Sequence, residues 1–302
     1  MNSDIKKTAI ALGSFDGLHR GHMAVIEKAV RQKENGLRPI AVTFKEHPQK
    51  YLNGSTPPLI FSGVVKERAF KDAGISLYEL DFADIMRLTP EEFFEKILIN
   101  KLHAAFISCG YNYRFGINGT GDAELLKELC EKKGIEFCVA PKVEFENEPI
   151  SSTRIRQAIL AGDIEKANMM LGRPFSYCEK VVSGDHIGRK LGAPTINQFF
   201  PENHIIPKFG VYISKVEIDG RFYRAVTNIG IRPTLELKVP RSETCIIDFS
   251  GDLYGRHIEV FLLKYLRPEL IFEGLDSLKG QIMSDIEKAR LYEEPEIYGR
   301  EI

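Results

Sequence analysis

Short apolar runs alternate with longer amphipathic segments over residues 1–140 of the chain. The runs predict strands because they are short, and the segments between them show apolar residues at the three-to-four spacing of a helix. The predicted strands are Thr8–Leu12, Ile40–Phe44, Ile75–Phe82, Ala104–Ser108 and Glu136–Ala140. The predicted helices are Met23–Glu34, Gly63–Ala73, Pro90–Leu102 and Ala123–Lys133.

Signals at the helix ends support this pattern. Thr89 with Glu92 is typical of a capping box, and Gly74 and Gly134 stand where helix C-caps belong. Alternation of strand and helix requires crossover connections, so we expect a mostly parallel sheet covered by helices on both faces. In such sheets ligands bind outside the carboxyl ends of the strands.

A helical stretch follows this α/β region. Ser152 or Thr153 is suited to cap a helix that runs to about Ala161, and a second helix follows it. The stretch Gly172-Arg173-Pro174 ends that second helix. We place the domain boundary at this stop, which divides the chain into residues 1–173 and 174–302.

From Phe175 onward the pattern predicts a different class of domain. Its apolar runs are short, rich in β-branched and aromatic residues, and separated by Gly, Pro, Asp and Asn. They lie at Tyr177–Val182, Gly210–Ile218, Phe222–Ile229, Thr244–Phe249 and His257–Tyr265. They predict an antiparallel β-barrel or sandwich, and Leu275–Leu291 is predicted to form an amphipathic closing helix.

The composition excludes several classes of protein and of partner. With 41 basic and 42 acidic residues in 302, no global charge recruits nucleic acid or an acidic membrane. No run reaches the roughly 18 apolar residues of a membrane helix, and the N-terminal run is too short for a secretion signal, so we expect a cytoplasmic protein. The five cysteines are odd in number and form no CxxC pair, which indicates free thiols.

The stretch GSFDGLHRGH (Gly13–His22) concentrates glycine and histidine where the first strand passes into the first helix. Gly13 and Gly17 let the backbone approach a ligand, and a helix beginning near His22 directs unsatisfied N–H groups at the same place. His19 and His22 can then both donate to phosphate oxygens in this cradle. Taken alone, the stretch is equally compatible with a glycine-rich turn carrying two solvent histidines.

Two further stretches are candidates for ligand binding. Gly110–Asp122 mixes glycines, aromatic residues and amides, which suits a pocket for a flat polar ring; a mobile glycine-rich loop is the alternative. Gly184–Gln198 holds three glycines and two basic residues, which suits a loop around phosphates. Thr195 and Asn197 would share one face of an extended segment there, as oxygen ligands of a phosphate-bound Mg²⁺.

The motifs of the first half resemble those of a known superfamily. GSFDGLHRGH is similar to the HxGH signature of adenylyl- and cytidylyltransferases, in which both histidines stabilise the transferring α-phosphate region. ISSTRIR (Ile150–Arg156) is similar to the element that closes over the ATP phosphates in these enzymes. GYNYRFG resembles the G-x-[DN]-F-x-F-G element of bacterial FAD synthetases, in which the residue matching Asn112 helps to hold the flavin.

The second half resembles riboflavin kinases. Gly184–Asn197 matches their pattern G-x-x-x-G-R-x-L-G-x-P-T-x-N, whose threonine and asparagine bind the Mg²⁺ of the nucleotide. SETCIIDF (Ser242–Phe249) matches their strand E-[ST]-H-x-x-D-F, in which the glutamate is the base for the ribityl 5′-hydroxyl. The resemblance therefore implies that role for Glu243, and it continues through Tyr265–Arg290.

Together these matches are identified as those of the bacterial bifunctional riboflavin kinase/FAD synthetase family. The resemblance implies a Rossmann-like domain and a six-stranded β-barrel with a C-terminal helix, which convert riboflavin to FMN and FMN to FAD with ATP and Mg²⁺. The expected catalytic residues are His19, His22 and Glu243, with Asn112 on the flavin and Thr195 and Asn197 on the metal. The expected ATP-binding residues are Gly13, Phe15, Asp16, Gly17, Ser152, Thr153, Arg156, Gly184, Gly188, Arg189 and Gly192.

The chain departs from the family pattern at three positions. Glu46 stands where the family often has Pro-His-Pro after the second strand. Cys245 replaces the histidine beside the proposed base, and Ile196 replaces the usual alanine between Thr195 and Asn197. The acid at Glu46 would alter the adenylyltransferase pocket. Neither of the other two changes removes a residue that would do chemistry, so both activities are expected.

Two alternative functions remain at this point. A nucleotidyltransferase for another acceptor, with an unrelated β-domain, would have no use for the second phosphate loop or for Glu243. A catalytically silent flavin-binding protein would bind riboflavin or FMN without releasing ADP or pyrophosphate. Oligomeric state, metal preference, redox dependence, relative rates and transfer of FMN between sites leave no signal in the sequence.

Overall fold

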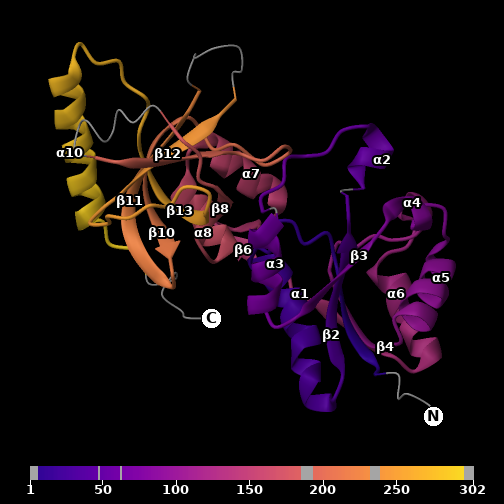
Figure 1. Ribbon diagram of the computed structural model, residues 1–302. Helices are drawn as coiled ribbons and strands as arrows, with labels where there is room; N and C mark the ends of the chain where they lie inside the picture. The colour runs from indigo at the N-terminus through magenta and orange to yellow at the C-terminus, as the bar shows by residue number, and fades with distance from the viewer. Residues whose placement is uncertain (1–5, 47, 62, 185–192, 232–238, 296–302) are drawn as a thin grey trace. The chain divides into compact units, whose positions relative to one another are not determined.

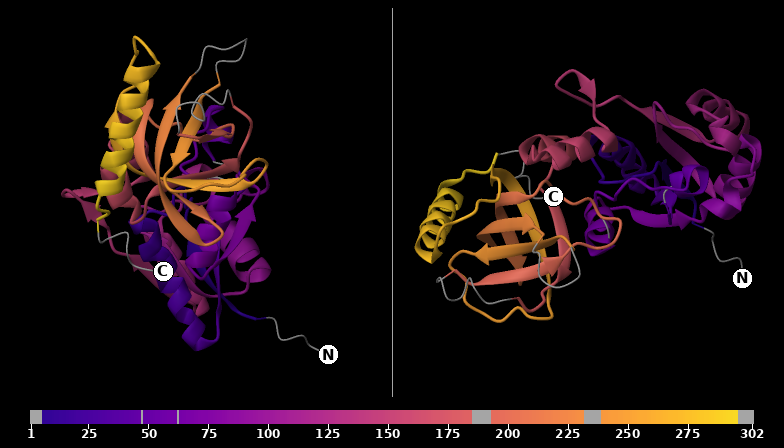
Figure 2. Two further views of the ribbon diagram at one scale, coloured as in Figure 1. Left: turned by 60° about the vertical axis from the view of Figure 1, so that its left-hand side comes forward. Right: turned by 90° about the horizontal axis from the view of Figure 1, so that it is seen from above.

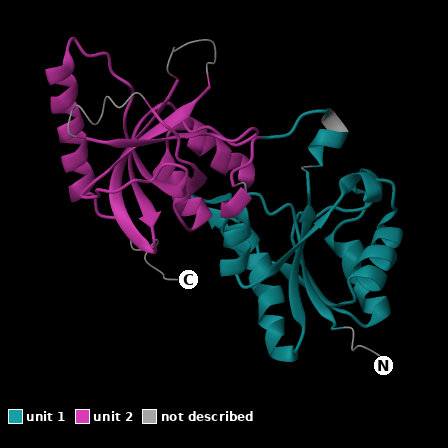
Figure 3. Ribbon diagram, viewed as in Figure 1, with its two compact units in different colours: residues 1–57, 66–151, 302 teal, residues 58–65, 152–301 magenta. Residues whose placement is uncertain are grey.

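The computed structural model describes residues 6–46, 48–61, 63–184, 193–231 and 239–295. The chain forms two compact units, coloured separately in Figure 3. Unit 1 runs to Ser151 without Pro58–Val65, and unit 2 contains Pro58–Val65 together with the described chain from Ser152 onward. The boundary predicted after residue 173 lies within unit 2, and as a boundary between functional domains it stays a prediction.

Among the described residues, unit 1 holds a parallel sheet of five strands in the order β3-β2-β1-β4-β5 (Figure 1). The strands are β1 (Thr8–Leu12), β2 (Arg38–Phe44), β3 (Ser76–Leu80), β4 (Ala104–Gly110) and β5 (Glu136–Ala140). Each coincides with or overlaps a predicted strand, so the predicted parallel α/β architecture is confirmed. Because β1 lies between β2 and β4, the carboxyl ends of β1 and β4 flank the point where the winding reverses.

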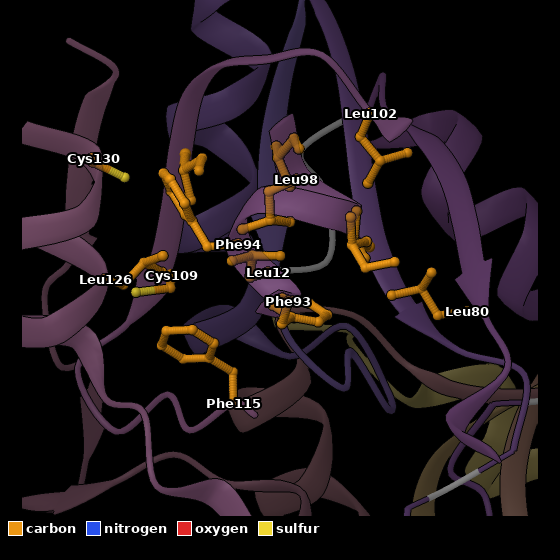
Figure 4. Packing of buried hydrophobic residues seen from close by; sticks show 14 of the residues in the cluster. Leu12, Leu80, Phe93, Phe94, Leu98, Leu102, Cys109, Phe115, Leu126 and Cys130 are labelled. Carbon is orange, nitrogen blue, oxygen red and sulfur yellow. The ribbon is translucent and has the colours of Figure 1, made fainter. Parts of the chain in front are cut away.

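Helices cover both faces of this sheet because the side chains of β1 alternate in direction. Ala9 and Ala11 pack in one core with residues of α1 and α3. Ile10 and Leu12 belong to a second core with residues of α5, η2 and α6, seen from close by in Figure 4. These helices are α1 (Arg20–Arg31), α3 (Gly63–Asp72), α5 (Pro90–Phe93), η2 (Phe94–Lys101) and α6 (Ala123–Lys133). The shorter elements are η1 (Gln32–Asn35), α2 (Gln49–Asn53), α4 (Phe82–Ile85), η3 (Ile117–Gly119), β6 (Glu144–Phe145) and β7 (Glu148–Pro149).

The helix predicted over Pro90–Leu102 is present but changes type along its length. Thr89 and Glu92 form the predicted capping box, with the Glu92 amide donating to Thr89 Oγ1 over 3.2 Å. From Phe94 to Lys101 the helix is π-helical, a wider winding that the apolar spacing does not reveal. The third strand ends at Leu80, earlier than predicted, because Asp81 caps α4 through the Ala83 amide.

Two helices open unit 2, α7 (Ser152–Ala161) and α8 (Ile164–Leu171). Helix α7 begins at Ser152, so Ser152 and Thr153 lie in its first turn, and the prediction that one of them precedes the helix as its cap is wrong. Helix α8 begins after Asp163, whose side chain accepts from the Lys166 amide, and ends at Gly172 as predicted.

The sheet of unit 2 is antiparallel and curled, as predicted for a barrel (Figure 2). In the described part it has six strands in the order β8-β13-β10-β11-β12-β9. They are β8 (Phe175–Lys180), β9 (Thr195–Phe199), β10 (Gly210–Ile218), β11 (Arg221–Gly230), β12 (Arg241–Ile246) and β13 (His257–Arg267). The two strands at the ends of this order, β8 and β9, approach each other. Val182, just after β8, forms a bridge with Asn197 of β9. The sequence analysis predicts only an extended segment around Thr195 and Asn197. In the structure this segment is strand β9, which completes the curl.

Helix α10 (Leu275–Leu291) closes unit 2 over the residues predicted for it. Its Ile286 and Ala289 are buried together with Ile213 and Leu263 of the sheet. In Figure 2 the helix lies along one side of the curled sheet. The buried Asp285 of α10 also accepts two hydrogen bonds from Arg267 of β13, at 3.0 and 2.7 Å. Apolar packing and an ion pair therefore both hold α10 on the sheet.

Candidate active sites

The Gly13–His22 stretch follows β1 directly, at the switch point of the parallel sheet. Its backbone is unusual, since Phe15 and Leu18 have φ values of 50° and 38° and Gly17 has 80°. The side chains of Phe15 and Leu18 are each only 1% exposed, so the surrounding core holds them in this strained conformation. Phe15 therefore offers a ligand its backbone and not its ring.

The two histidines of the stretch lie face to face. Their ring centroids are 3.6 Å apart, and the ring of Phe15 meets His22 edge-on at 5.4 Å. His19 is the N-cap of α1, and its Nδ1 accepts from the His22 amide over 3.3 Å. Because Nδ1 accepts, the neutral His19 ring carries its proton on Nε2. The helix therefore begins just before the position near His22 that the sequence predicts, and both rings lie at its start.

Burial controls the charge of both rings. Desolvation lowers the pKa of His19 to about 4. Desolvation, with a contribution from the nearby charge of His19, lowers the pKa of His22 well below its usual value. Both rings are therefore neutral near pH 7, each with one N–H to donate. His22 Nδ1 is buried and has no hydrogen-bond partner among the described residues, as expected for an atom that a ligand would engage.

The Gly110–Asp122 stretch follows β4, so it lies on the other side of the same switch point. Its second half is closed by a bridge between Phe115 and Gly121, and a side chain at Gly121 would come within 2.7 Å of the Phe115 ring. Tyr113 stacks on Phe115 with centroids 5.8 Å apart, and burial raises the pKa of its hydroxyl. Asn112 is exposed in the turn between β4 and this packed segment.

The remaining candidates of the first half belong to different elements. Asp16 is buried in the loop after β1, whereas Ser152, Thr153 and Arg156 belong to the beginning of α7 in unit 2. Arg156 Nε donates to the Pro58 carbonyl over 2.8 Å, which anchors its guanidinium within that unit.

The outer face of the curled sheet in unit 2 and helix α10 enclose a cavity of about 310 Å³. Polar groups from four strands meet in it, and apolar side chains of the sheet, of α10 and of the segment before α10 line the rest. The lining residues are Ala193, Thr195, Val211, Val226, Asn228, Glu243, Cys245, Arg267, Glu269, Leu270, Phe272, Leu278, Ile282 and Asp285. A part-polar, part-apolar cavity of this kind suits a flat ring with a polar tail.

Strand register explains why the polar groups gather there. Asn197 of β9, Glu243 of β12 and Asn228 of β11 are directly paired, so their side chains share one face of the sheet. Thr195 and Cys245 form the neighbouring pair on that face. The sequence analysis named Thr195, Asn197 and Glu243 separately, and the sheet brings them together.

The carboxylate of Glu243 has a close cationic neighbour. Glu243 Oε1 lies 2.9 Å from Arg241 Nη2, and the two side chains are 17% and 14% exposed. Glu243 is therefore mostly withdrawn from solvent, unlike most strand glutamates, and its carboxylate reaches the cavity.

Gly184 packs tightly against the same row. A Cβ built on it would lie 2.4 Å from Asn197 Nδ2, so only glycine fits beside that amide. The predicted phosphate-loop residues Gly188, Arg189 and Gly192 lie outside the described residues.

Sequence reasoning missed several cavity residues. Asn228 Nδ2 donates to Glu269 Oε1 over 3.2 Å, which adds a second carboxylate to the polar end. Arg267 and Asp285 form the ion pair under α10. Asn228 could have been identified only from its pairing with Glu243. The local sequences of β11 and β12 do not reveal which of their residues pair.

The donor set fits a hard divalent cation. Thr195 and Asn197 offer a hydroxyl and an amide oxygen from one face of β9, beside the Glu243 carboxylate. Oxygen donors of this kind, completed by phosphate oxygens, are what Mg²⁺ prefers. In the described part of the chain, no three His, Cys, Asp or Glu side chains form a metal-binding group. The hydroxyl of Thr195 and the amide oxygen of Asn197 suit a metal whose other ligands are phosphate oxygens of a nucleotide.

Two of the residues that depart from the family pattern, Glu46 and Cys245, have surroundings that suit them. Glu46 accepts from Lys50 and from the Tyr51 hydroxyl, and the hydrogen bond from Lys50 lowers the pKa of its carboxyl. Burial raises the pKa of Cys245 to about 11, so its thiol is neutral at the cavity wall.

Comparison with family models gives two matches. Residues 1–154 match the model described as FAD synthetase, and residues 171–292 match the model described as riboflavin kinase. The chain belongs to the bifunctional riboflavin kinase/FMN adenylyltransferase family. The expectation drawn from its motifs is confirmed.

Relatives of that name extend over almost the whole chain. A bifunctional riboflavin kinase/FMN adenylyltransferase of Listeria monocytogenes is 32% identical over 96% of this chain and 93% of its own. One of Bacillus subtilis is 33% identical over 95% of this chain and 92% of its own.

A solved structure from Streptococcus pneumoniae, described as a macrolide-efflux protein, is 34% identical, with a TM-score of 0.87 over 96% of this chain and 95% of its own. That description concerns the pneumococcal protein. In the described residues of this chain, no helix has both the length and the apolar character needed to cross a membrane.

Proposed function

We propose that the chain carries out two successive reactions on one flavin. Unit 2 transfers the γ-phosphoryl group of ATP to riboflavin and produces FMN and ADP. The HxGH site of unit 1 then joins FMN to the adenylyl group of a second ATP and produces FAD and pyrophosphate. The observation that carries this proposal is the group Thr195, Glu243 and Asn228 in the cavity under α10, with Asn197 paired to Glu243 beside it, because a nucleotidyltransferase alone has no use for it.

In the kinase reaction, Glu243 is the general base. The isoalloxazine ring binds among the apolar side chains of the cavity, such as Leu270 and Phe272, and the ribityl chain points to Glu243. Glu243 takes the proton of the 5′-hydroxyl, the hydroxyl oxygen bonds to the γ-phosphorus, and the bond from that phosphorus to ADP breaks. Thr195 and Asn197 would hold the Mg²⁺ of ATP, which supplies charge neutralisation on the phosphates.

In the adenylyl transfer, no proton has to be removed, because the phosphate of FMN is already anionic. Its oxygen bonds to the α-phosphorus of ATP, and the bond to pyrophosphate breaks. His19 and His22 donate to the phosphate oxygens as charge shifts, which is a preorganised electrostatic role. Asn112 contacts the flavin. The nucleotide is bound by Ser152, Thr153 and Arg156 and by the loop backbone at Gly13, Phe15, Asp16 and Gly17.

The cytoplasm is the proposed location, and small molecules are the proposed partners. ATP is abundant there, and all five cysteines are free thiols, as a reducing compartment favours.

Incubation of the purified chain with riboflavin, ATP and Mg²⁺ tests the proposal. Chromatography should show FMN first and FAD later, with ADP and pyrophosphate in matching amounts. Binding of riboflavin or FMN without either product would contradict it, and so would FAD formation from added FMN with no phosphorylation of riboflavin. Omission of Mg²⁺ should abolish both products.

A further inference from the structure

Arg241 is a cation at the edge of the riboflavin cavity that no family motif includes. It lies two residues before Glu243 on β12, so both side chains are on the same face of the strand. Their ion pair joins Arg241 Nη2 to Glu243 Oε1 at 2.9 Å. Both side chains are mostly buried, and a charge withdrawn from water needs a partner of opposite charge.

A second carboxylate, that of Glu269, lies against β11, the strand that pairs with β12. Arg241 pairs in register with Gly230 of β11. A Cβ on Gly230 would lie 2.4 Å from Glu269 Oε1, so the Glu269 carboxylate sits over that glycine. Asn228, two residues earlier on β11, donates to the same carboxylate and is itself paired with Glu243. Asn228, Glu243 and Glu269 therefore line the polar end of the cavity, and Arg241 adjoins this group through its ion pair with Glu243.

The other neighbour of Glu243 on that face carries no charge. Cys245 lies two residues after Glu243, and burial keeps its thiol protonated. An ion pair with a partly buried arginine fixes a carboxylate more firmly than an exposed pair does, since less of the attraction is screened. Of the two neighbours of Glu243 on this face of β12, only Arg241 therefore carries a charge that can fix the position of the Glu243 carboxylate.

We propose that Arg241 is a positioning residue for riboflavin phosphorylation, which holds Glu243 Oε1 so that the carboxylate is presented to the 5′-hydroxyl. This inference rests on the proposed role of Glu243 as base. Arg241 itself contacts no reacting atom. Its loss therefore lowers the turnover of bound riboflavin and leaves the binding of riboflavin in the apolar part of the cavity unchanged.

Steady-state FMN formation by the full-length chain tests this assignment in three variants. Arg241→Met keeps the apolar stem and removes the charge, and should lower kcat about 10- to 100-fold with the riboflavin KM within about twofold. Arg241→Lys keeps a cation and should recover most of the lost kcat. Arg256→Met removes an arginine paired with Asp219 at 2.6 Å on the exposed surface, and should leave both constants unchanged.

Each result decides the question. A kcat of Arg241→Met within twofold of the parent would overturn the proposal, and so would an equal loss of riboflavin binding in both Arg241 variants, measured by flavin fluorescence, because that indicates a structural role. Should Arg241→Met not melt cooperatively, Arg241→Gln is judged by the same criteria. The variant Glu243→Gln distinguishes an error in the proposed base from an error in the proposed role of Arg241. If it still forms FMN, the proposed base is wrong; if it does not while Arg241→Met is unaffected, only the role of Arg241 is wrong.

Discussion

His19 and His22 show how much a residue's chemistry depends on its surroundings. Their spacing in the sequence identifies them as a pair, but their neutral state follows from burial and from the stacking of the two rings. His19 also caps α1, so its ring is oriented by the helix it begins. Glu243 is comparable, since its chemical partners come from β9, β11 and its own strand.

Removal of one histidine should separate the two activities. His22→Ala deletes a preorganised donor to developing charge, which typically costs roughly 10²–10³ in rate. FAD formation from FMN and ATP should fall by that factor, and FMN formation from riboflavin should persist, as measured by chromatography. His103→Asn is the matched control, because asparagine tolerates the φ of 54° at that histidine. Loss of both activities in a folded His22→Ala protein would contradict the assignment of two sites.

A methyl group at Gly184 should impair only the kinase. Its Cβ would lie 2.4 Å from the amide of Asn197, so Gly184→Ala displaces a proposed metal ligand. FMN formation should fall and require more Mg²⁺ for half-maximal rate, whereas FAD formation from FMN should be unchanged. Gly280→Ala, in α10, is the control, since a Cβ there meets nothing within 4 Å. Equal kinase rates in the two variants would argue against the role of Asn197.

At the scale of elements, the position of α10 determines whether the cavity exists. The helix is held by its apolar face and by two aspartate–arginine pairs of different burial. Arg267 and Asp285 are 15% and 2% exposed at a distance of 2.7 Å, and Gln281 also donates to Asp285. Arg290 and Asp248 form a similar pair that is exposed to solvent. Only the first pair lines the cavity.

The two pairs should therefore differ in their contribution to stability. Asp285→Asn leaves Arg267 without its charge partner, and should lower the free energy of unfolding by about 3–5 kcal/mol and raise the riboflavin KM. Asp248→Asn should leave both nearly unchanged, because water screens an exposed pair. Urea denaturation and riboflavin titration measure the two effects. Equal destabilisation by the two variants would show that α10 is not held by the buried pair.

At the scale of the whole molecule, each unit contains a histidine that is buried and neutral near pH 7. His19 lies in unit 1, and His204 in unit 2 packs against Phe175 and Phe200. Desolvation lowers the pKa of each to about 4. The unfolded chain takes up these protons near pH 6.5, whereas the folded chain does not until about pH 4.

Acidification should consequently destabilise both units. Between about pH 6.5 and 4 the unfolded state binds more protons, so stability falls as the pH falls, by up to about 3 kcal/mol for each of these two histidines. Thermal denaturation at pH 7 and pH 5 measures this as a lower Tm at pH 5. His204→Phe removes one of the titrating groups and should reduce the pH dependence. An unchanged Tm over this range would contradict the burial of neutral histidines.

The sequence by itself determined the class of each domain and most of the strands and helices, and it named the candidate residues for binding phosphate. These features are local, because periodicity, caps and motifs involve neighbours along the chain. Only the tertiary structure decided that β9 completes the curl, that Asn228 and Glu269 join Glu243, and that α10 encloses the cavity. Cross-strand pairing and burial join segments far apart in sequence, and the chemical state of a side chain such as His19 or Cys245 depends on them.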